Sequence, residues 1–295
     1  MNFHRVLICA VAVLAGSPVL AQDYEIRLTR PAKLGQKYEV TMSAEKSEQM
    51  TISLEGRVVQ ETKSYLSATL EGTFTILKVD KLQQESEVRL LVSKFRKKTG
   101  KNAIEEEVLP KGTQVVARRR DSKKEFLVNG KVASKDIAKV LDLFFSLKDS
   151  RVTDDDILGT KDRKKVGDRW TVHSMKAAED LASEGLKVDA KNIKGSSKIE
   201  KLVLVRGTKC LLIRGKMALD MIAPPLPAGL AVEKSSLSLS FSGEFPVDIS
   251  IRRLSQKNTG TMTLVAKGKP SSDAPEITLS MKIIQSKQMK RKFLK

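Results

Sequence analysis

The sequence contains few of the side chains that carry catalysis or covalent cross-links: two cysteines, two histidines and one tryptophan in 295 residues. Two cysteines are too few for a disulfide-based scaffold, and Cys9 lies in an apolar N-terminal segment. Catalysis through a histidine base would depend on His173, because His4 lies in the same segment. The sequence contains no nucleophile elbow, phosphate-binding glycine loop or HExxH zinc motif. We therefore expect a non-enzymatic protein without a cofactor or a metal site.

Long apolar runs are also rare, and the clearest one lies at the N-terminus. Residues 1–5 are basic, residues 6–16 are apolar, and Val19 and Ala21 stand at the positions read by a signal peptidase. The apolar run is shorter than the ~20 residues that span a bilayer. We therefore predict a signal peptide over residues 1–21, cleavage after Ala21, and a periplasmic or extracellular protein. Cys210 would then be the single cysteine, and we interpret it as a buried hydrophobic residue, with a reactive thiol as the alternative.

Positive charge is in excess, with 54 Lys and Arg against 35 Asp and Glu and a net charge of +19. The last residues are especially basic, and we interpret residues 287–295 as a basic tail. Clustered basic residues favour an anionic membrane or envelope polymer as partner, whereas nucleic acid is disfavoured because aromatic residues for base stacking are few. A solubilising tail without a partner is the alternative. The candidate surface-binding residues are Lys287, Lys290, Arg291, Lys292 and Lys295.

Alternation with period two runs through much of the chain and indicates strands with one buried face. The clearest strand covers residues 237–251, and shorter ones cover residues 38–44, 50–54 and 277–283. Turn sequences at 206–209 and 258–260 predict hairpins between neighbouring strands. We predict a mainly β (α+β) protein, built from a long curved antiparallel sheet or partial barrel. One face of the clearest strand carries Leu237, Leu239, Phe241, Phe245, Val247 and Ile249.

Two helices interrupt the strands. Helical spacing of apolar residues after Ser134, a candidate N-cap, predicts a covering helix to residue 147 with Phe144 and Phe145 on its apolar face. A shorter helix is expected over residues 175–183. The acidic run Asp154, Asp155 and Asp156 follows Thr153 and indicates a capped helix start, with a hard-cation site as the alternative.

The chain divides around the covering helix. We expect an N-terminal β half over residues 22–133, the helix and Asp-rich connection over residues 134–160, and a C-terminal β half over residues 161–286. Segments 34–40 (LGQKYEV) and 166–172 (VGDRWTV) share a pattern of glycine, aromatic and valine positions. The halves are thus candidates for a pseudo-repeat, with an ordinary turn into a strand as the alternative.

Four short segments carry a resemblance to known proteins: LGQKY at 34–38, FLVNG at 126–130, DDILG at 155–159 and VGDRW at 166–170. Through them the chain resembles a domain-of-unknown-function family of exported bacterial proteins, which implies no activity. The order of strands and helix is distantly similar to LolA-type lipoprotein carriers, in which a curved sheet holds acyl chains. That similarity concerns the fold, and a fold does not determine function.

We therefore favour a binding module for an apolar or lipid-like ligand, held between the curved sheet and the covering helix. If the two pack tightly, the same residues form an ordinary core. The second hypothesis is an envelope scaffold that uses the basic C-terminal residues. The oligomeric state stays open. The candidate ligand-lining residues are Leu237, Leu239, Phe241, Phe245, Val247, Phe144 and Phe145.

Overall fold

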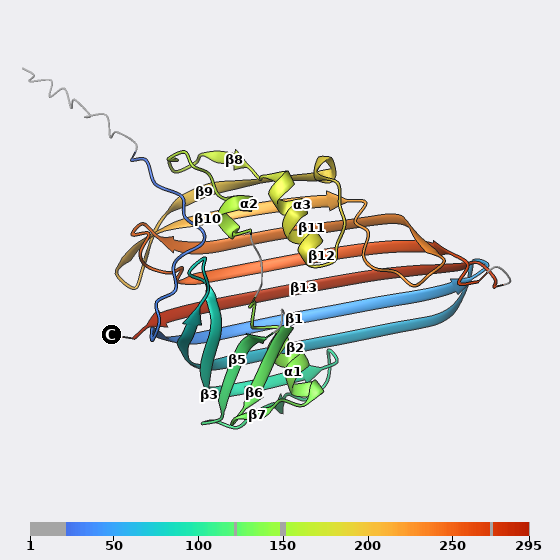
Figure 1. Ribbon diagram of the computed structural model, residues 1–295, viewed down its shortest axis with the longest axis horizontal. Coiled ribbons are helices and arrows are strands. Elements are labelled where there is room, and N and C mark those ends of the chain that lie inside the picture. The colour runs from blue at the N-terminus through green and yellow to red at the C-terminus, as the bar shows by residue number, and fades with distance from the viewer. Residues whose placement is uncertain (1–21, 121–122, 148–151, 272–273, 295) are drawn as a thin grey trace, which may run out of the picture.

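The computed structural model describes residues 22–120, 123–147, 152–271 and 274–294. In this part of the chain thirteen strands form one open antiparallel sheet, in the order β7-β6-β5-β3-β2-β1-β13-β12-β11-β10-β9-β8 with β4 paired to β3 (Figure 1). The predicted mainly β class is confirmed. The strands are β1 (Lys37–Leu54), β2 (Arg57–Val79), β3 (Glu85–Thr99), β4 (Glu106–Glu107), β5 (Gln114–Arg120), β6 (Lys123–Val128), β7 (Lys131–Val132), β8 (Arg169–Thr171), β9 (Ile193–Val205), β10 (Thr208–Asp220), β11 (Leu230–Pro246), β12 (Ser255–Gly268) and β13 (Ile277–Phe293). The helices are α1 (Lys135–Asp142), α2 (Asp154–Leu158), α3 (Ser174–Ser183) and the 3-10 turn η1 (Ala190–Asn192).

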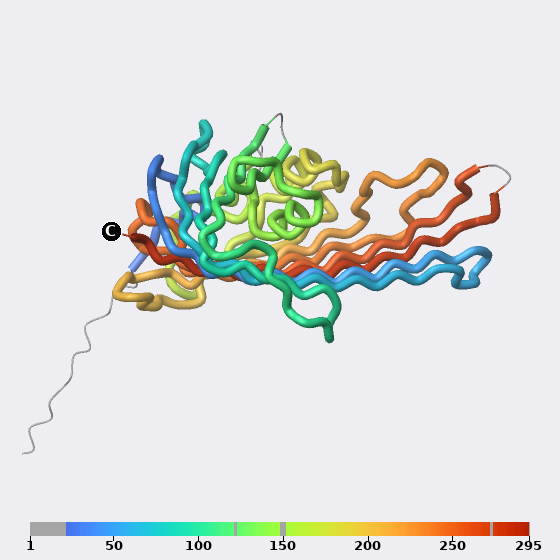
Figure 2. The backbone as a smooth tube through the Cα atoms, turned by 90° about the horizontal axis from the view of Figure 1, so that it is seen from below, coloured from blue at the N-terminus to red at the C-terminus, as the bar shows by residue number. Residues whose placement is uncertain are grey.

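The three α-helices lie on one face of the sheet, over one half of its length (Figure 2). The other half, in which β1, β2, β12 and β13 run side by side, extends without a helix on either face. The burial of β1 follows this division. In its first part every second residue is buried, namely Tyr38, Val40, Met42 and Ala44. No residue of β1 after Ala44 is fully buried. No helix among the described residues has the length and apolarity to cross a membrane.

Local sequence signals set the helix starts. The Ser134 side chain accepts a hydrogen bond from the N–H of Ile137 at the start of α1. The helix ends at Asp142 rather than at residue 147, but Phe144 and Phe145 in the following turn are each only 4% exposed. Thr153 forms a capping box at α2, which confirms the helix-start interpretation of the acidic run. The predicted helix at 175–183 is confirmed as α3.

One predicted hairpin is correct and one is wrong. Arg206 and Gly207 join β9 to β10 with φ of 49° and 80°, as a two-residue hairpin turn requires. The predicted turn at 258–260 lies inside β12, and the reversal occurs earlier, at residues 247–254. Strand β11 ends at Pro246. A turn follows, in which Oδ1 of Asp248 accepts a hydrogen bond from the N–H of Ser250.

The predicted basic tail is wrong, because residues 287–293 form the last part of β13, in the middle of the sheet between β1 and β12. In a strand, alternate side chains point to opposite faces. Lys287 and Arg291 thus point to the covered face, whereas Lys290 and Lys292 are exposed on the other. Lys295 lies outside the described residues.

The two halves of the chain belong to one sheet, since β13 of the C-terminal half pairs along its length with β1 of the N-terminal half. Gly35 and Gly167 each have a positive φ, of 76° and 95°, in turns that lead into β1 and β8. These two strands differ in place, because β1 is central and β8 is an edge strand. The shared sequence pattern therefore accounts for a similar turn at two different positions in the sheet.

Candidate functional site

The covered face of the sheet contains two adjoining cavities. The polar cavity has a volume of about 350 Å³ and is lined by residues that include Tyr38, Glu85, Arg252 and Arg291. The apolar cavity has a volume of about 890 Å³, and its lining includes Met217, Leu239, Phe241 and Phe245. Residues from α2, β12, β13 and the segment after α1 line both cavities, so they form a continuous space. The lining residues shared by both are Leu28, Phe145, Ser146, Leu147, Asp154, Arg253, Gln256, Asn258 and Lys287.

Glycines in the neighbouring strands shape the floor of the apolar cavity. A Cβ at Gly215 of β10 would lie 2.1 Å from Cε1 of Phe241, so the Phe241 ring lies across the place of the missing side chain. Likewise, a Cβ at Gly260 of β12 would lie 3.1 Å from Cδ2 of Leu239. The Phe241 and Leu239 side chains of β11 therefore lie flat over the neighbouring glycines of β10 and β12, and space remains above them.

The predicted ligand-lining residues separate into two groups. Leu239, Phe241, Phe245 and Phe145 line the apolar cavity. Leu237, Val247 and Phe144 do not line it and only pack in or against the hydrophobic core. Ile249, which was expected on the same face, is 39% exposed because it lies in the turn after β11. Four of the seven predicted ligand-lining residues therefore form one wall of the apolar cavity.

An apolar strip lies on the same face along the uncovered half of the sheet, and Lys46, Glu48 and Gln285 separate it from the cavities. The register pairs alternate residues of β13 and β1 on one face, beginning with Arg291 opposite Val40 and passing Lys287 opposite Ala44. Farther along, this face is apolar and half-buried, which marks it as a surface able to contact apolar molecules. The strip consists of Ile277, Leu279, Met281, Ile283, Met50, Ile52 and Leu54.

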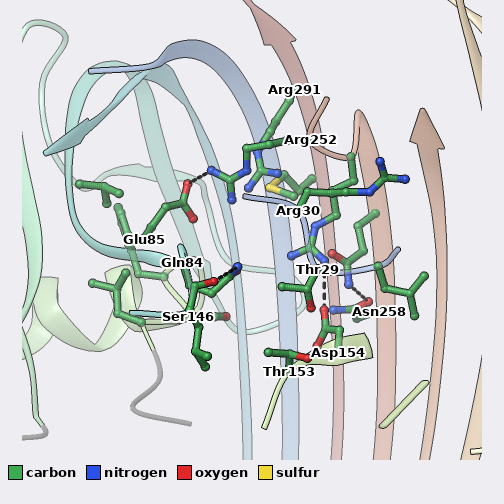
Figure 3. Close-up of a pocket in the computed structure, with 18 of the residues that line it drawn as sticks. Thr29, Arg30, Gln84, Glu85, Ser146, Thr153, Asp154, Arg252, Asn258 and Arg291 are labelled. Atoms are coloured by element: carbon green, nitrogen blue, oxygen red, sulfur yellow. Dashed lines mark hydrogen bonds and ion pairs between the residues drawn. The ribbon is translucent and has the colours of Figure 1, made fainter. Parts of the chain in front are cut away.

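The polar cavity contains a network built from four distant segments (Figure 3). Glu85 Oε1 accepts hydrogen bonds from Tyr38 Oη and Arg252 Nη1, both at 2.5 Å. The guanidinium carbon of Arg291 lies 5.0 Å from the centre of the Tyr38 ring, and that of Arg252 lies 5.9 Å from it. Tyr38 begins β1, Glu85 begins β3, Arg291 belongs to β13, and Arg252 lies between β11 and β12.

Burial and charge determine the protonation of this network. Burial acts to raise the pKa of Glu85, but the charges of Arg252 and Arg291 outweigh it and hold that pKa at about 2. Burial, and then the negative charge of Glu85, raise the pKa of Tyr38. Burial lowers the pKa of Arg291 to about 10. At neutral pH the network therefore contains one carboxylate, two guanidinium groups and a neutral tyrosine.

Several donors of this network have no protein acceptor. Arg252 and Arg291 are only 5% and 6% exposed. Within the described residues, Nε of Arg252 and both Nε and Nη1 of Arg291 are buried without a hydrogen-bond partner. Buried polar groups are normally paired, so unpaired guanidinium nitrogens beside a cavity indicate a place for an external acceptor.

Lys287 stands at the junction of the two cavities. Its Nζ donates to the backbone oxygen of Phe144 at 2.5 Å, and burial lowers its pKa to about 8. Arg253, in the same wall, pairs with Asp154 at 3.2 Å. Of the predicted surface-binding residues, Lys287 and Arg291 thus face the cavities, whereas Lys292 pairs with Glu39 on the opposite face. The four of these residues that the structure describes therefore lie on two opposite faces of the sheet.

The acidic run and Cys210 have structural roles, and His173 lies at the surface. Asp155 accepts from the N–H groups of Leu28 and Thr29 at 2.6 and 3.2 Å, and therefore ties the N-terminal segment to α2. No cluster of three or more metal-ligating side chains occurs among the described residues. Cys210 is fully buried, and burial raises the pKa of its thiol to about 11, as expected for a structural cysteine. His173 is exposed at the start of α3.

Sequence reasoning missed Tyr38, Glu85 and Arg252 as site residues, and assigned Arg291 to a surface. A glutamate directly after a polar turn and an arginine in a connection have no sequence pattern that distinguishes them from solvated charges. The only local signal was the strand alternation, which places Arg291 on the same face as Met289.

No protein-family model and no curated protein matches the sequence, so the resemblance to an exported bacterial family stays a prediction. Among solved structures, one titled "Lipid-protein interactions in lipovitellin" is 6% identical with a TM-score of 0.33, and the match covers 86% of this chain but only 25% of that chain. The outer membrane protein OprG from Pseudomonas aeruginosa is 7% identical with a TM-score of 0.17, over 90% of this chain and 99% of that chain. DynF from Micromonospora chersina is 8% identical with a TM-score of 0.18, over 96% and 92%. At these TM-scores the matches assign neither a fold family nor a function.

Proposed function

We propose that this is an exported, non-enzymatic binding protein that holds an apolar, lipid-like molecule in the apolar cavity. The observation that carries the proposal is the hollow above Gly215 and Gly260, walled by Leu239, Phe241 and Phe245. Its volume of about 890 Å³ lies within the usual range for small-molecule sites, which are concave and mostly apolar. A ligand that covers these side chains gains about 25 cal/mol for each Å² of apolar surface that it removes from water.

The surrounding structure supports a chain-like ligand rather than a compact one. The apolar cavity adjoins the polar cavity, and the apolar strip of β1 and β13 lies farther along the same face of the sheet. An elongated molecule can contact the adjoining cavities and this strip at the same time. The exported location follows from the predicted signal peptide.

Binding of a neutral apolar dye tests the proposal. Nile red should bind to the mature protein with increased fluorescence, and native mass spectrometry should show lipid that co-purifies with it. Phe241→Asp places a charge in the wall of the cavity, and we expect it to weaken dye binding at least tenfold. Phe241 is half-buried, so the variant is expected to fold, which circular dichroism checks.

Ser238→Asp is the matched control, because Ser238 is exposed on the opposite face of the same strand. It should bind the dye as the wild type does. Equal binding by both variants, or absence of both dye binding and co-purified lipid, would overturn the proposal.

A further inference from the structure

We propose that the polar cavity binds a monoanionic head group, with Arg291 and Arg252 as donors, so that the ligand is an anionic single-chain amphiphile such as a fatty acid. This inference rests on the proposed function and adds the chemistry of the head group. Three observations support it: a charge imbalance among buried groups, guanidinium donors without hydrogen-bond partners, and apolar cavity walls next to these donors.

The charge imbalance lies among buried groups. In the part of the chain that the structure describes, Glu85 is the carboxylate that contacts Arg252 and Tyr38, and the guanidinium of Arg291 lies over the Tyr38 ring beside them. Among these three charged groups one positive charge is thus left without a counter-charge, and both arginines are almost fully buried. Buried charges are stable only when they are paired and hydrogen-bonded. One further negative charge completes the network, which favours a carboxylate over a doubly charged phosphate.

The other charged groups of the cavity are engaged elsewhere. Asp80 accepts from the backbone N–H groups of Leu82 and Gln84, and Asp154 pairs with Arg253. Arg30 donates to three backbone oxygens, those of Arg27, Pro246 and Asp248. Asp180 also lines the cavity, from α3. Arg291 and Arg252 are thus the basic residues here with unpaired guanidinium nitrogens among the described residues.

The unpaired donors suit a carboxylate. A guanidinium group presents its N–H donors in a planar fork that binds both oxygens of a carboxylate at once. Nε of Arg291 belongs to the side edge of its guanidinium and Nη1 to the end edge, and both are unpaired, so each edge presents a free donor to a carboxylate oxygen. The Tyr38 ring beneath the guanidinium holds it by a cation–π contact and limits its motion. The donor set is therefore already in place before a ligand arrives.

The walls that lead away from this head-group site are apolar. On the covered face of β13, Met289 follows Arg291 and lies opposite Met42, and Phe74 and Phe145 stack with ring centres 5.4 Å apart. Lys287 lies about 13 Å along the strand from Arg291, at about 3.3 Å per residue, where the apolar cavity begins. A head group at Arg291 thus places its chain toward Phe241 and Phe245.

The test compares a fluorescent fatty acid, cis-parinaric acid, with its uncharged methyl ester on the full mature chain. The wild type should bind the acid at least tenfold more tightly than the ester. Arg291→Met should abolish this preference while it leaves the affinity for the ester unchanged. Lys290→Met is the matched control, since Lys290 is adjacent but exposed on the other face, and it should keep the preference.

Equal binding of acid and ester by the wild type, or an unchanged preference in Arg291→Met, would overturn the head-group assignment and leave the proposed function standing. Failure of both probes to bind would instead overturn the proposed function. If Arg291→Met does not fold, Arg291→Lys keeps the charge but removes the fork, and it should lower the preference at least threefold. An unchanged preference in Arg291→Lys would then count against the assignment.

Discussion

Replacement of Glu85 by glutamine tests the energetics of the polar network. Glutamine keeps an oxygen for the Tyr38 hydroxyl but removes the charge that balances Arg252. Removal of one partner from a buried ion pair costs about 3 to 5 kcal/mol. The Glu85 side chain is 19% exposed, which favours the lower end of that range. A pKa lowered from 4.5 to about 2 gives about 3 kcal/mol independently, at 1.36 kcal/mol per pKa unit.

The pH dependence provides the more specific check. Because folding lowers the pKa of Glu85, its contribution is complete above the unfolded value of about 4.5 and is lost as the pH falls toward 2. Urea unfolding at a series of pH values measures the free energy of unfolding for wild type and Glu85→Gln. The difference should be about 3 kcal/mol at pH 7 and should approach zero at pH 2.

Glu39→Gln is the control for this experiment, because Glu39 forms an exposed ion pair with Lys292 and is half exposed. Exposed pairs contribute about 0 to 1 kcal/mol. A loss in Glu85→Gln no larger than that of the control would refute the reasoning. So would a difference that stays constant from pH 7 to pH 2.

Three further predictions concern the core, the junction and export. Phe144→Ala should lower the free energy of unfolding by about 3 to 5 kcal/mol, because the ring packs edge-on against Phe95 at 6.0 Å; a loss below about 1 kcal/mol in urea would show loose packing. Lys287→Met should raise stability by about 3 kcal/mol at pH 7, because folding lowers the pKa of Lys287 from 10.5 to about 8 and the buried charge opposes folding below that pH. That gain should disappear toward pH 11, and a destabilised variant would contradict it. N-terminal sequencing of the exported protein should begin at Gln22, whereas Met1 would exclude cleavage.

Local sequence patterns determined the strands, the helix starts and one hairpin. Alternation in 38–44 and 237–245 reports which face of a strand is apolar, and this depends only on the neighbouring residues. Ser134 and Thr153 cap helices through bonds to residues three positions away. Arg206 and Gly207 adopt the backbone angles of a two-residue turn. Each of these features is decided within a few residues, so the sequence by itself was sufficient.

Pairing between distant strands decided the rest. The segment 287–293 appeared as a tail because its lysines and arginines alternate with few apolar residues, but β1 and β12 supply hydrogen-bonding partners on both sides. Ile249 continued the alternation of its strand, yet the chain turns after Pro246 to bring β12 alongside β11.

The polar network depends most completely on the tertiary structure. Tyr38 and Arg291 meet because the first and last long strands of the chain pair in the centre of the sheet. Glu85 and Arg252 join them from a strand start and a connection. A charged side chain is stable in the interior only if its partners arrive there too, and those partners lie far away in the sequence. The sequence therefore determined the strands and their apolar faces, whereas only the folded sheet decided which charges became buried together and where a cavity remained.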